Sequence, residues 1–300
     1  MNFSPLYNTF KSISQILRDS DIVNLGADTK SINTSHDIQK NIDFLTNDLL
    51  KECIKDITEI IGLVSEEDKE FILLKPDAKR GYVLVFDPLD GSKNVYSNLT
   101  MGTIYGIYEY DVQADKIISI YESGYALYGP STILVKTDNN QRVNQYYLNK
   151  ENQFTLVREL KSIKKHNICS VNLSYNIDKD YQNLVNTLIK NGCTQRWSGA
   201  MVADAHQVIM RGGTFIYPQN DKNPNGKIRI LYEAFPFAHI FTVLGGCALD
   251  TNYQNILSKL PLIKLKTGKM LHGEIPIILS TAMNQEEINT ILEINDIIKC

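Results

Sequence analysis

The sequence FDPLDGSKN, residues 86–94, decides the fold, because it follows the apolar run GYVLVF of residues 81–86. That run predicts a buried strand, and the motif predicts the turn at the carboxyl end of this strand. Pro88 fixes the backbone after Asp87, so the carboxylates of Asp87 and Asp90 can point to the same side of the turn. Two like charges this close repel each other and need a compensating cation, solvent or a shared proton.

The residues after the second aspartate suit an anion. Gly91 lets the backbone approach a ligand closely, and the amide groups of Gly91 and Ser92 can form an anion-binding nest. Carboxylates beside such a nest suit a divalent cation that holds a phosphate, since Mg²⁺ prefers carboxylate oxygens and bridges to phosphate. The alternative is a solvated turn, because Asp-Pro-x-Asp-Gly is common turn chemistry. The motif alone leaves both interpretations open.

Further acids lie at the ends of predicted strands and helices, namely Asp37, Asp43, Glu66, Glu67 and Glu233. Glu66 and Glu67 follow an apolar strand in LVSEED, as Asp87 does in its own strand. Glu233 precedes an apolar helix in ILYEAFP, which is a poor place for an uncompensated carboxylate. This second group of acids favours a metal site over a solvated turn.

Composition restricts the class of protein. The chain has 300 residues, of which 43% are hydrophobic and 22% charged, so it can form one large domain or two ordinary ones. A net charge of -3 offers no basic field and excludes general nucleic-acid binding. The sequence shows no signal peptide or membrane span, and its five scattered cysteines predict reduced thiols without a metal. We therefore expect a cytoplasmic protein with no membrane partner.

Hydrophobic periodicity divides the chain near residue 160. Helical spacing occurs at residues 6–19 and 38–56. Segments that alternate with turn residues predict antiparallel strands at residues 59–67, 81–90, 101–111, 116–129 and 131–138. Around residues 150–165 the pattern loosens. We predict an α/β fold with two domains, residues 1–160 and 161–300.

The second half of the chain changes to an order of strand, helix and strand. Extended segments are predicted at residues 165–173, 214–218 and 276–280. Helices are predicted at residues 181–192, 200–213, 232–246 and 284–299. Gly192 suits a helix C-cap and Asn284 a helix N-cap. His206 and His239 lie on apolar helices, so we expect them in the core.

Several blocks together carry a resemblance to a known family. Beside FDPLDGSKN, they are VSEED, MGTIYGIY, ESGYALYGPSTILV, RWSGAMVADAHQVIMRGGTFIYP and NPNGKIRILYEAFPFAHIFTVLGG, in this order. Over residues from about 6 to 295, the chain resembles class I fructose-1,6-bisphosphatase, a member of the Mg²⁺-dependent, Li⁺-sensitive sugar-phosphatase superfamily. DPLDGS alone gives the superfamily, and the later blocks indicate the bisphosphatase. The resemblance implies a layered αβαβα fold.

The resemblance also implies a metal site, most of it in the first domain. Its metal ligands fall on Glu66, Asp87, Asp90, Glu233 and the Leu89 carbonyl. Asp37 falls in a loop segment that helps with an additional metal, and Asp43 and Glu67 fall where the family activates the attacking water. The implied cofactor is Mg²⁺, two or more ions per subunit, with Mn²⁺ as a possible substitute.

The substrate site implied by the resemblance spans both domains. Beside the metals it falls on Asp90, Gly91, Ser92 and Lys93. The pocket for the 6-phosphate, in the second domain, falls on Asn172, Tyr175, Trp197, Tyr217 and Lys227, with Met201 at a sugar contact. Arg196 falls where a neighbouring subunit contributes an arginine, which implies a homo-oligomer, at least a dimer and usually a tetramer.

This sequence departs from the family pattern at three places. Trp197 stands where the family usually has Tyr, and an indole N–H can donate a hydrogen bond but cannot accept one. Lys93 replaces the usual Ser. Gly273-Glu274 replaces the usual Gln-Arg, which we expect to remove a structural ion pair near the C-terminus.

The implied activity is hydrolysis of the 1-phosphate of fructose 1,6-bisphosphate, a sugar bisphosphate, in gluconeogenesis. The nearest alternative is sedoheptulose-1,7-bisphosphatase or a dual-specificity enzyme. An inositol-phosphate or nucleotide phosphatase would explain the DPLDGS turn but not Lys227 and Arg196. A non-catalytic sugar-phosphate sensor is the third alternative, and the intact set of acids argues against it.

The resemblance has a consequence for regulation by AMP. Well-known family members bind AMP through an N-terminal arm, a Lys-Tyr pair before the DPLDGS strand and an Arg after it. Here the arm is missing ahead of LYNTF, Gly81 stands at the Lys position beside a retained Tyr82, and Glu109 stands at the Arg position. We expect this site to repel AMP.

Overall fold

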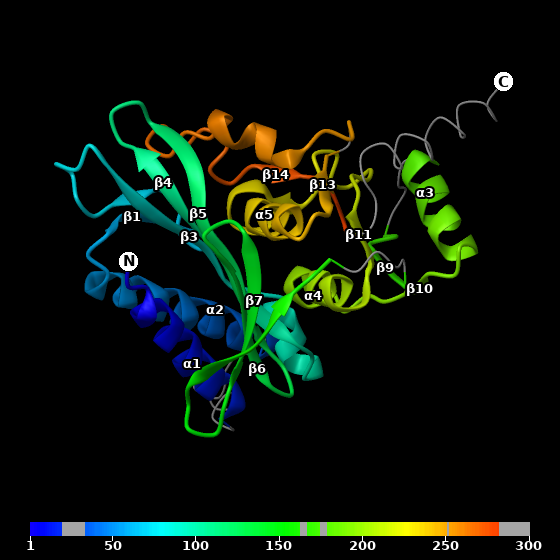
Figure 1. The fold of residues 1–300 in the computed structure, drawn as a ribbon, viewed down its shortest axis with the longest axis horizontal. Coiled ribbons are helices and arrows are strands. Elements are labelled where there is room, and N and C mark those ends of the chain that lie inside the picture. Colours follow the sequence, from blue (N-terminus) through cyan, green and yellow to red (C-terminus); the bar gives the residue numbers. More distant parts are fainter. Residues whose placement is uncertain (20–33, 163–166, 175–178, 251, 282–300) are drawn as a thin grey trace.

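The structure is a computed structural model that describes residues 1–19, 34–162, 167–174, 179–250 and 252–281, without the side chains of residues 34–40 and 180. Helices and sheets alternate in space (Figure 1). The α-helices of the described residues are α1 (Ser4–Arg18), α2 (Thr34–Cys53), α3 (Lys179–Lys190), α4 (Met201–Arg211) and α5 (Phe235–Val243). Short helical turns lie at η2 (Ile54–Asp56), η3 (Ser92–Ser97), η4 (Ile230–Ala234) and η5 (Ile256–Leu262).

The first sheet has eight strands in the order β2-β1-β3-β4-β5-β6-β7-β8. Its strands are β1 (Ile60–Ser65), β2 (Ile72–Leu73), β3 (Arg80–Asp90), β4 (Met101–Asp111), β5 (Lys116–Tyr128), β6 (Thr132–Asp138), β7 (Arg142–Leu148) and β8 (Phe154–Leu160). From β3 to β8 each strand runs antiparallel to the previous one, whereas β1 and β3 are parallel. The parallel pair therefore ends at the same edge of the sheet.

The second sheet has five strands in the order β10-β9-β11-β15-β13. Its strands are β9 (Ile168–Val171), β10 (Thr194–Gln195), β11 (Gly213–Tyr217), β13 (Cys247–Leu249) and β15 (Ile277–Ser280). A separate antiparallel pair consists of β12 (Ile228–Arg229) and β14 (Glu274–Ile275).

Three hydrophobic cores lie between the layers. Leu6, Phe10 and Ile13 on one face of α1 pack with α2 against the first sheet. The largest core joins the other face of that sheet to α4, α5 and the second sheet, and the smallest joins the second sheet to α3. Figure 1 shows this succession, with α1 and α2 outside the first sheet, α4 and α5 between the sheets and α3 beyond the second. The expected αβαβα layering is confirmed.

Most predicted elements occur within a few residues of their expected bounds. The second helix begins at Thr34 rather than residue 38, so Asp37 and Asp43 lie inside it and do not flank its start, contrary to expectation. The prediction missed β7 and β8. In β8, six consecutive residues from Phe154 are wholly or partly exposed, so no alternation of apolar and polar residues marks this edge strand. The helix predicted at residues 284–299 lies outside the described residues.

Among the described residues, no helix combines the length and the apolar character needed to cross a bilayer. The division into domains at residues 1–160 and 161–300 stays a proposal.

Candidate active site and metal centre

A cleft of about 310 Å³ opens where β1 and β3 end, opposite the start of α4 and the turn η4. Charged and polar side chains dominate one part of its wall and aromatic ones another. The lining residues include Asp43, Glu66, Glu67, Asp87, Leu89, Asp90, Gly91, Ser92, Lys93, Trp197, Met201, Tyr217, Lys227, Arg229, Glu233 and Glu274.

The end of β3 presents both aspartates of the DPLDGS motif to the cleft. The β3–β4 register shifts between Asp87 and Asp90, so the strand bulges over Pro88 and Leu89. The bulge is held by the Thr103 hydroxyl, which donates to the Pro88 carbonyl at 2.8 Å, and by the Leu89 N–H, which donates to Asp87 at 3.0 Å. The prediction that both carboxylates face one side is confirmed, because one oxygen of Asp87 and one of Asp90 lie within 4.8 Å of each other.

Gly91 joins the motif to α4. Its φ of +76° is left-handed, and a Cβ at this position would lie 2.3 Å from the Cβ of Ala200. The close approach lets the Val202 N–H, in the first turn of α4, donate to Asp90 Oδ2 at 2.6 Å. A side chain at Gly91 would therefore separate Asp90 from the helix that orients it. The helical turn η3 begins directly afterwards, at Ser92.

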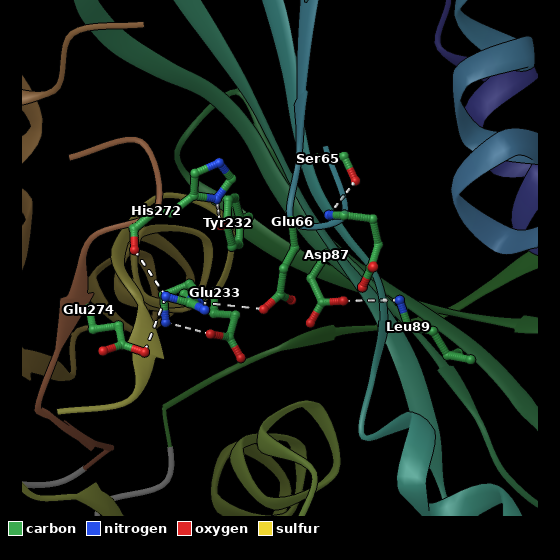
Figure 2. A network of polar contacts seen from close by, with 10 residues as sticks. Ser65, Glu66, Asp87, Leu89, Tyr232, Glu233, His272 and Glu274 are labelled. Atoms are coloured by element: carbon green, nitrogen blue, oxygen red, sulfur yellow. Dashed lines mark hydrogen bonds and ion pairs between the residues drawn. The ribbon is translucent and has the colours of Figure 1, made fainter. Parts of the chain in front are cut away.

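Glu66 and Glu67 reach the same cleft from β1. The parallel register pairs Ser65 with Phe86, which places Glu66 beside Asp87. The Glu66 N–H donates to the Phe86 carbonyl at 3.1 Å, and the Glu67 N–H donates to the Ser65 hydroxyl at 3.2 Å. Figure 2 shows the carboxylates of Glu66 and Asp87 side by side at the ends of their strands.

The loop after β1 is attached to α2, which carries Asp43. The Ser65 hydroxyl donates to Asn47 Oδ1 at 2.8 Å, and Lys51 forms an ion pair with Asp68 at 3.0 Å. Because Asn47 and Lys51 lie one and two turns beyond Asp43 on the helix, these contacts fix the helix relative to Glu67. Asp43 and Glu67 consequently line the same cleft.

Glu233 arrives from η4, a π-helical turn that precedes α5. Its carboxylate accepts a 2.5 Å hydrogen bond from the backbone N–H of Arg229. Only 8% of the Glu233 surface and 4% of the Asp87 surface are exposed, so these charges are shielded from water. Pi-helical turns are rare and often occur at functional sites.

Burial and mutual repulsion raise the pKa values of the cluster. Burial raises the pKa of Asp87 well above its usual value, and Glu66, Asp90 and Glu233 raise it further. Burial, with repulsion from Glu66 among others, raises the pKa of Asp90 to about 7. The pKa of Glu233 is raised well above normal in the same way, and burial also raises that of Glu66, although Arg229 opposes this. Such a cluster favours a bound cation over four free charges.

The residues fit a hard divalent cation. Asp87, Asp90 and Glu233 each offer one carboxylate oxygen, and these oxygens all lie within 4.8 Å of one another. Glu66 lies beside them, and Leu89 also lines the cleft. Oxygen ligands without Cys or His are the set that Mg²⁺ or Mn²⁺ takes.

The raised pKa of Asp90 predicts how the stability of the metal-free protein changes with pH. A carboxyl whose pKa is raised on folding stabilises the folded state fully at pH values below its unfolded pKa near 3.8. This stabilisation is lost as pH rises through the folded pKa of about 7. We therefore expect Asp90→Asn to raise the melting temperature in EDTA more at pH 8 than at pH 5.

Thermal unfolding of wild type and variant at both pH values checks this expectation. Asp111→Asn is the matched control, because Asp111 is an ion-pair partner of Arg80 at the far end of β3 and its pKa is lowered rather than raised. Its effect should be the same at pH 5 and pH 8, since the control carboxyl is ionised at both. An equal gain from Asp90→Asn at both pH values would contradict the expectation.

The other part of the cleft wall is basic and aromatic. The Trp197 ring packs against Phe215 and Tyr217, with centroids 6.3 and 5.9 Å apart, and 42% of Trp197 stays exposed. The exposed Lys227 and Lys93 also line the cleft. One cavity is thus lined by a carboxylate cluster, by ammonium groups and by aromatic rings.

The structure gathers most of the predicted site residues in this cleft. Asn172 and Arg196 do not line it, although Asn172 is a hydrogen-bond partner of Tyr217 and Arg196 is exposed next to Trp197. The side chains of Asp37 and Tyr175 lie outside the described ones. His206 and His239 are bonded to Tyr125 and Ser123 in the core, as expected.

Sequence reasoning missed Arg229 and its contact with Glu274. Arg229 Nη1 lies 3.1 Å from Glu274 and Arg229 Nε 3.6 Å from Glu66. The expected loss of the family's ion pair at Gly273-Glu274 stays a prediction, and among the described residues position 274 carries a different ion pair, with Arg229. The arginine between the apolar Ile228 and Ile230 was a signal that could have been noticed, since a charge inside an apolar run needs a partner.

Comparisons with known proteins agree with this geometry. The family model described as "Fructose-1-6-bisphosphatase, N-terminal domain" matches residues 2–159, and the model of the C-terminal domain matches residues 163–291. The chain belongs to the fructose-1,6-bisphosphatase family.

Relatives of this fructose-1,6-bisphosphatase family cover most of the chain. It is 36% identical to fructose-1,6-bisphosphatase 1 of Rattus norvegicus, over 96% of this chain and 81% of the relative. It is 33% identical to fructose-1,6-bisphosphatase class 1 of Campylobacter hominis, over 85% of this chain and 89% of the relative. The crystal structure of Leishmania major fructose-1,6-bisphosphatase in holo form superposes with a TM-score of 0.81 at 27% identity, covering 98% of this chain and 93% of the other.

Proposed function

We propose that this protein hydrolyses the 1-phosphate of D-fructose 1,6-bisphosphate and yields fructose 6-phosphate and phosphate, as a step of gluconeogenesis. The observation that carries the proposal is the single cleft lined both by a carboxylate cluster and by cationic and aromatic groups. A substrate with two phosphates needs both kinds of group, one for cleavage and one for anchoring. Membership of the family supports the same reaction.

The proposed metal ligands are Glu66, Asp87, Asp90, Glu233 and the Leu89 carbonyl, with Asp37 for an additional ion. We propose Mg²⁺, two or more ions per subunit, with Mn²⁺ as a substitute. When bound, the ions offset phosphate charge and lower the pKa of a water molecule. The protein's own contribution is to hold the carboxylates close together before a cation arrives, through the bulge in β3 and the parallel register of β1.

Asp43 and Glu67 are the proposed groups that orient the attacking water and accept its proton. Burial, and repulsion from Asp68, raise the pKa of Glu67 above its usual value. A carboxylate with a raised pKa is a better base near neutral pH. The water oxygen attacks phosphorus in line and the bond from phosphorus to the sugar oxygen breaks, through a loose transition state. The sugar oxygen leaves with the bonding electrons and takes up a proton from solvent, and the amides of Gly91 and Ser92 stabilise the negative charge on the phosphate.

The proposed pocket for the 6-phosphate lies at the basic and aromatic part of the cleft wall. Lys227 supplies positive charge there, and Tyr217, Asn172 and Tyr175 supply polar donors. The indole N–H of Trp197 can donate one hydrogen bond. Lys93 places a second ammonium group near the motif, and Met201 provides an apolar contact for the sugar.

Arg196 supports the proposal of an oligomer. Its guanidinium is exposed and does not line the cleft of its own chain. We propose that it reaches the 6-phosphate pocket of a neighbouring subunit, in a homo-oligomer that is at least a dimer and by family analogy a tetramer. We propose a cytoplasmic location on the same analogy.

Phosphate release tests the assignment against its alternatives. The purified protein is assayed with Mg²⁺ and fructose 1,6-bisphosphate, sedoheptulose 1,7-bisphosphate or inositol 1-phosphate. The account predicts the highest kcat/KM for fructose 1,6-bisphosphate. Preference for the sedoheptulose compound would support sedoheptulose-1,7-bisphosphatase activity instead. Preference for inositol 1-phosphate would overturn the assignment of the 6-phosphate pocket.

The position at which well-known family members bind AMP carries an aromatic cluster and a carboxylate in this chain. Tyr82 packs edge-on against Tyr121 with ring centroids 5.1 Å apart, and Phe3 packs against Tyr121 at 5.9 Å. Glu109 lies directly opposite Tyr82 on β4. A Cβ at Gly81 would lie 2.3 Å from Ile61, so a larger side chain does not fit without a shift.

We expect AMP up to millimolar concentration to leave the rate of phosphate release unchanged. Glu109 repels a phosphate at a position where an arginine would attract it, and Gly81 offers no charge. The measurement is an AMP titration of the fructose 1,6-bisphosphate assay at constant free Mg²⁺, because AMP itself binds the cation. Cooperative inhibition at micromolar AMP would show that AMP binds elsewhere or that this site is misplaced.

A further inference from the structure

Arg229 stands between the carboxylate cluster and the rim of the cleft, and it contacts both sides. Its Nε lies 3.6 Å from Glu66, whereas its Nη1 lies 3.1 Å from Glu274 and donates to the His272 carbonyl at 3.0 Å. The two short contacts hold the guanidinium toward the rim, and the contact with Glu66 is the longest of the three. Figure 2 shows this network, with Glu274 and His272 on one side and Glu66 on the other.

The position of Glu274 follows from a defined backbone pairing. In the antiparallel pair of β12 and β14, Arg229 and Glu274 are directly opposite each other. The preceding His272 is bonded through Nε2 to the Lys69 carbonyl at 3.1 Å and through Nδ1 to the Tyr232 hydroxyl at 2.5 Å. The strand that carries Glu274 is therefore tied both to the loop that follows Glu66 and to η4.

We propose that Glu274 is a positioning residue, which holds Arg229 at the rim and so leaves Glu66 available to a divalent cation. This inference rests on the proposed metal site. A guanidinium is charged at every accessible pH and competes with a cation for the oxygens of Glu66. With Glu274 in place, the arginine has another carboxylate partner. Without Glu274, Glu66 is the remaining carboxylate that pairs with the arginine side chain among the described residues.

Loss of the Glu274 charge has opposite consequences for a cation and for an anion. The cation meets a less negative cleft and a stronger competitor at Glu66, so its affinity falls. A phosphate meets less repulsion and an arginine with one partner fewer, so its affinity rises. A residue that merely joined β12 to β14 would, on removal, loosen the cleft and weaken both ligands together.

The test is the Glu274→Gln protein, which keeps the shape of the side chain and removes its charge. Mn²⁺ binding and inorganic phosphate binding at saturating Mn²⁺ are measured by titration calorimetry, with the emission of the cleft-lining Trp197 as a second readout. We expect the Kd of Mn²⁺ to rise about three- to tenfold, as for one charge screened at close range, and the Kd of phosphate to fall at least about twofold. An unchanged Kd of Mn²⁺, or weaker binding of both ligands, would overturn the proposal.

Asp111→Asn is the matched control, because Arg80 and Asp111 are also a cross-strand pair of arginine and carboxylate, at the opposite end of β3. Both affinities should stay at their wild-type values in this variant. If the Kd of Mn²⁺ rises as much in Asp111→Asn as in Glu274→Gln, the rise comes from the change in the protein's net charge, and the proposal fails.

A double-mutant cycle with Arg229→Gln tests whether Glu274 acts through the arginine. In the Arg229→Gln background, Glu274→Gln should change log Kd for Mn²⁺ by less than half as much as it does in the wild-type background. An undiminished effect would overturn the role of Arg229. If the wild-type protein binds no Mn²⁺, the metal site itself is wrong. If the wild type turns over fructose 1,6-bisphosphate with Mn²⁺ but Glu274→Gln binds Mn²⁺ as tightly as wild type, only this inference is wrong.

Discussion

The Asp87→Asn protein should lose turnover of fructose 1,6-bisphosphate by at least roughly 10²–10³-fold, the loss typical when one group that stabilises transition-state charge is removed. Asp87 is buried at the centre of the cluster, where its carboxylate is next to Glu66, Asp90 and Glu233. An amide keeps the hydrogen bond from Leu89 through its oxygen but carries no charge for a cation. The rate of phosphate release with Mg²⁺ measures this loss.

The fold of Asp87→Asn should survive, because the substitution relieves repulsion inside the cluster. Its melting temperature in EDTA should equal or exceed that of wild type, and Glu66→Gln should behave alike. Asp111→Asn, which removes a partly buried carboxylate in an ion pair with Arg80, should keep wild-type turnover. Substantial Mg²⁺-dependent activity in either cluster variant would mean that the metal site has been assigned wrongly.

The Lys227→Ala protein should bind the bisphosphate poorly while its response to Mg²⁺ stays the same. A hydrogen bond to a charged group contributes roughly 1.5–3 kcal/mol, so KM should rise about tenfold to hundredfold. Lys227 lines the cleft and is exposed, hence its loss leaves no buried charge unpaired. Steady-state kinetics at several Mg²⁺ concentrations separate the two effects.

Lys222→Ala serves as the control for Lys227→Ala, because Lys222 is exposed in the same loop but does not line the cleft. Its KM should match that of wild type. An unchanged KM in Lys227→Ala would place the 6-phosphate elsewhere, and a parallel shift in the Mg²⁺ requirement would indicate that the lysine acts on the metal site.

Local chemistry made the DPLDGS turn predictable. Proline fixes the backbone after Asp87, and glycine permits the left-handed turn after Asp90, so both carboxylates face one side, and the structure has them so. The apolar runs of β3, β4 and β5 are buried over most of their length, so their sequence pattern was clear. The edge strand β8 was missed, because a strand exposed on both faces carries no such pattern.

The contacts of Arg229 were beyond sequence reasoning for a different reason. They depend on the pairing of β12 with β14, two strands of two residues each that are far apart in the sequence. Nothing in IRI or in HGEIP states that the two segments meet. For the same reason the sequence did not indicate that Glu274 finds a partner in β12.

The most direct test of the central claim identifies the product of the reaction. The protein is incubated with fructose 1,6-bisphosphate and Mg²⁺, and the sugar monophosphate that forms is identified by ³¹P NMR. The account predicts fructose 6-phosphate with one equivalent of phosphate, and no release of phosphate in EDTA. Formation of fructose 1-phosphate, or release that EDTA leaves unchanged, would contradict cleavage at the carboxylate cluster.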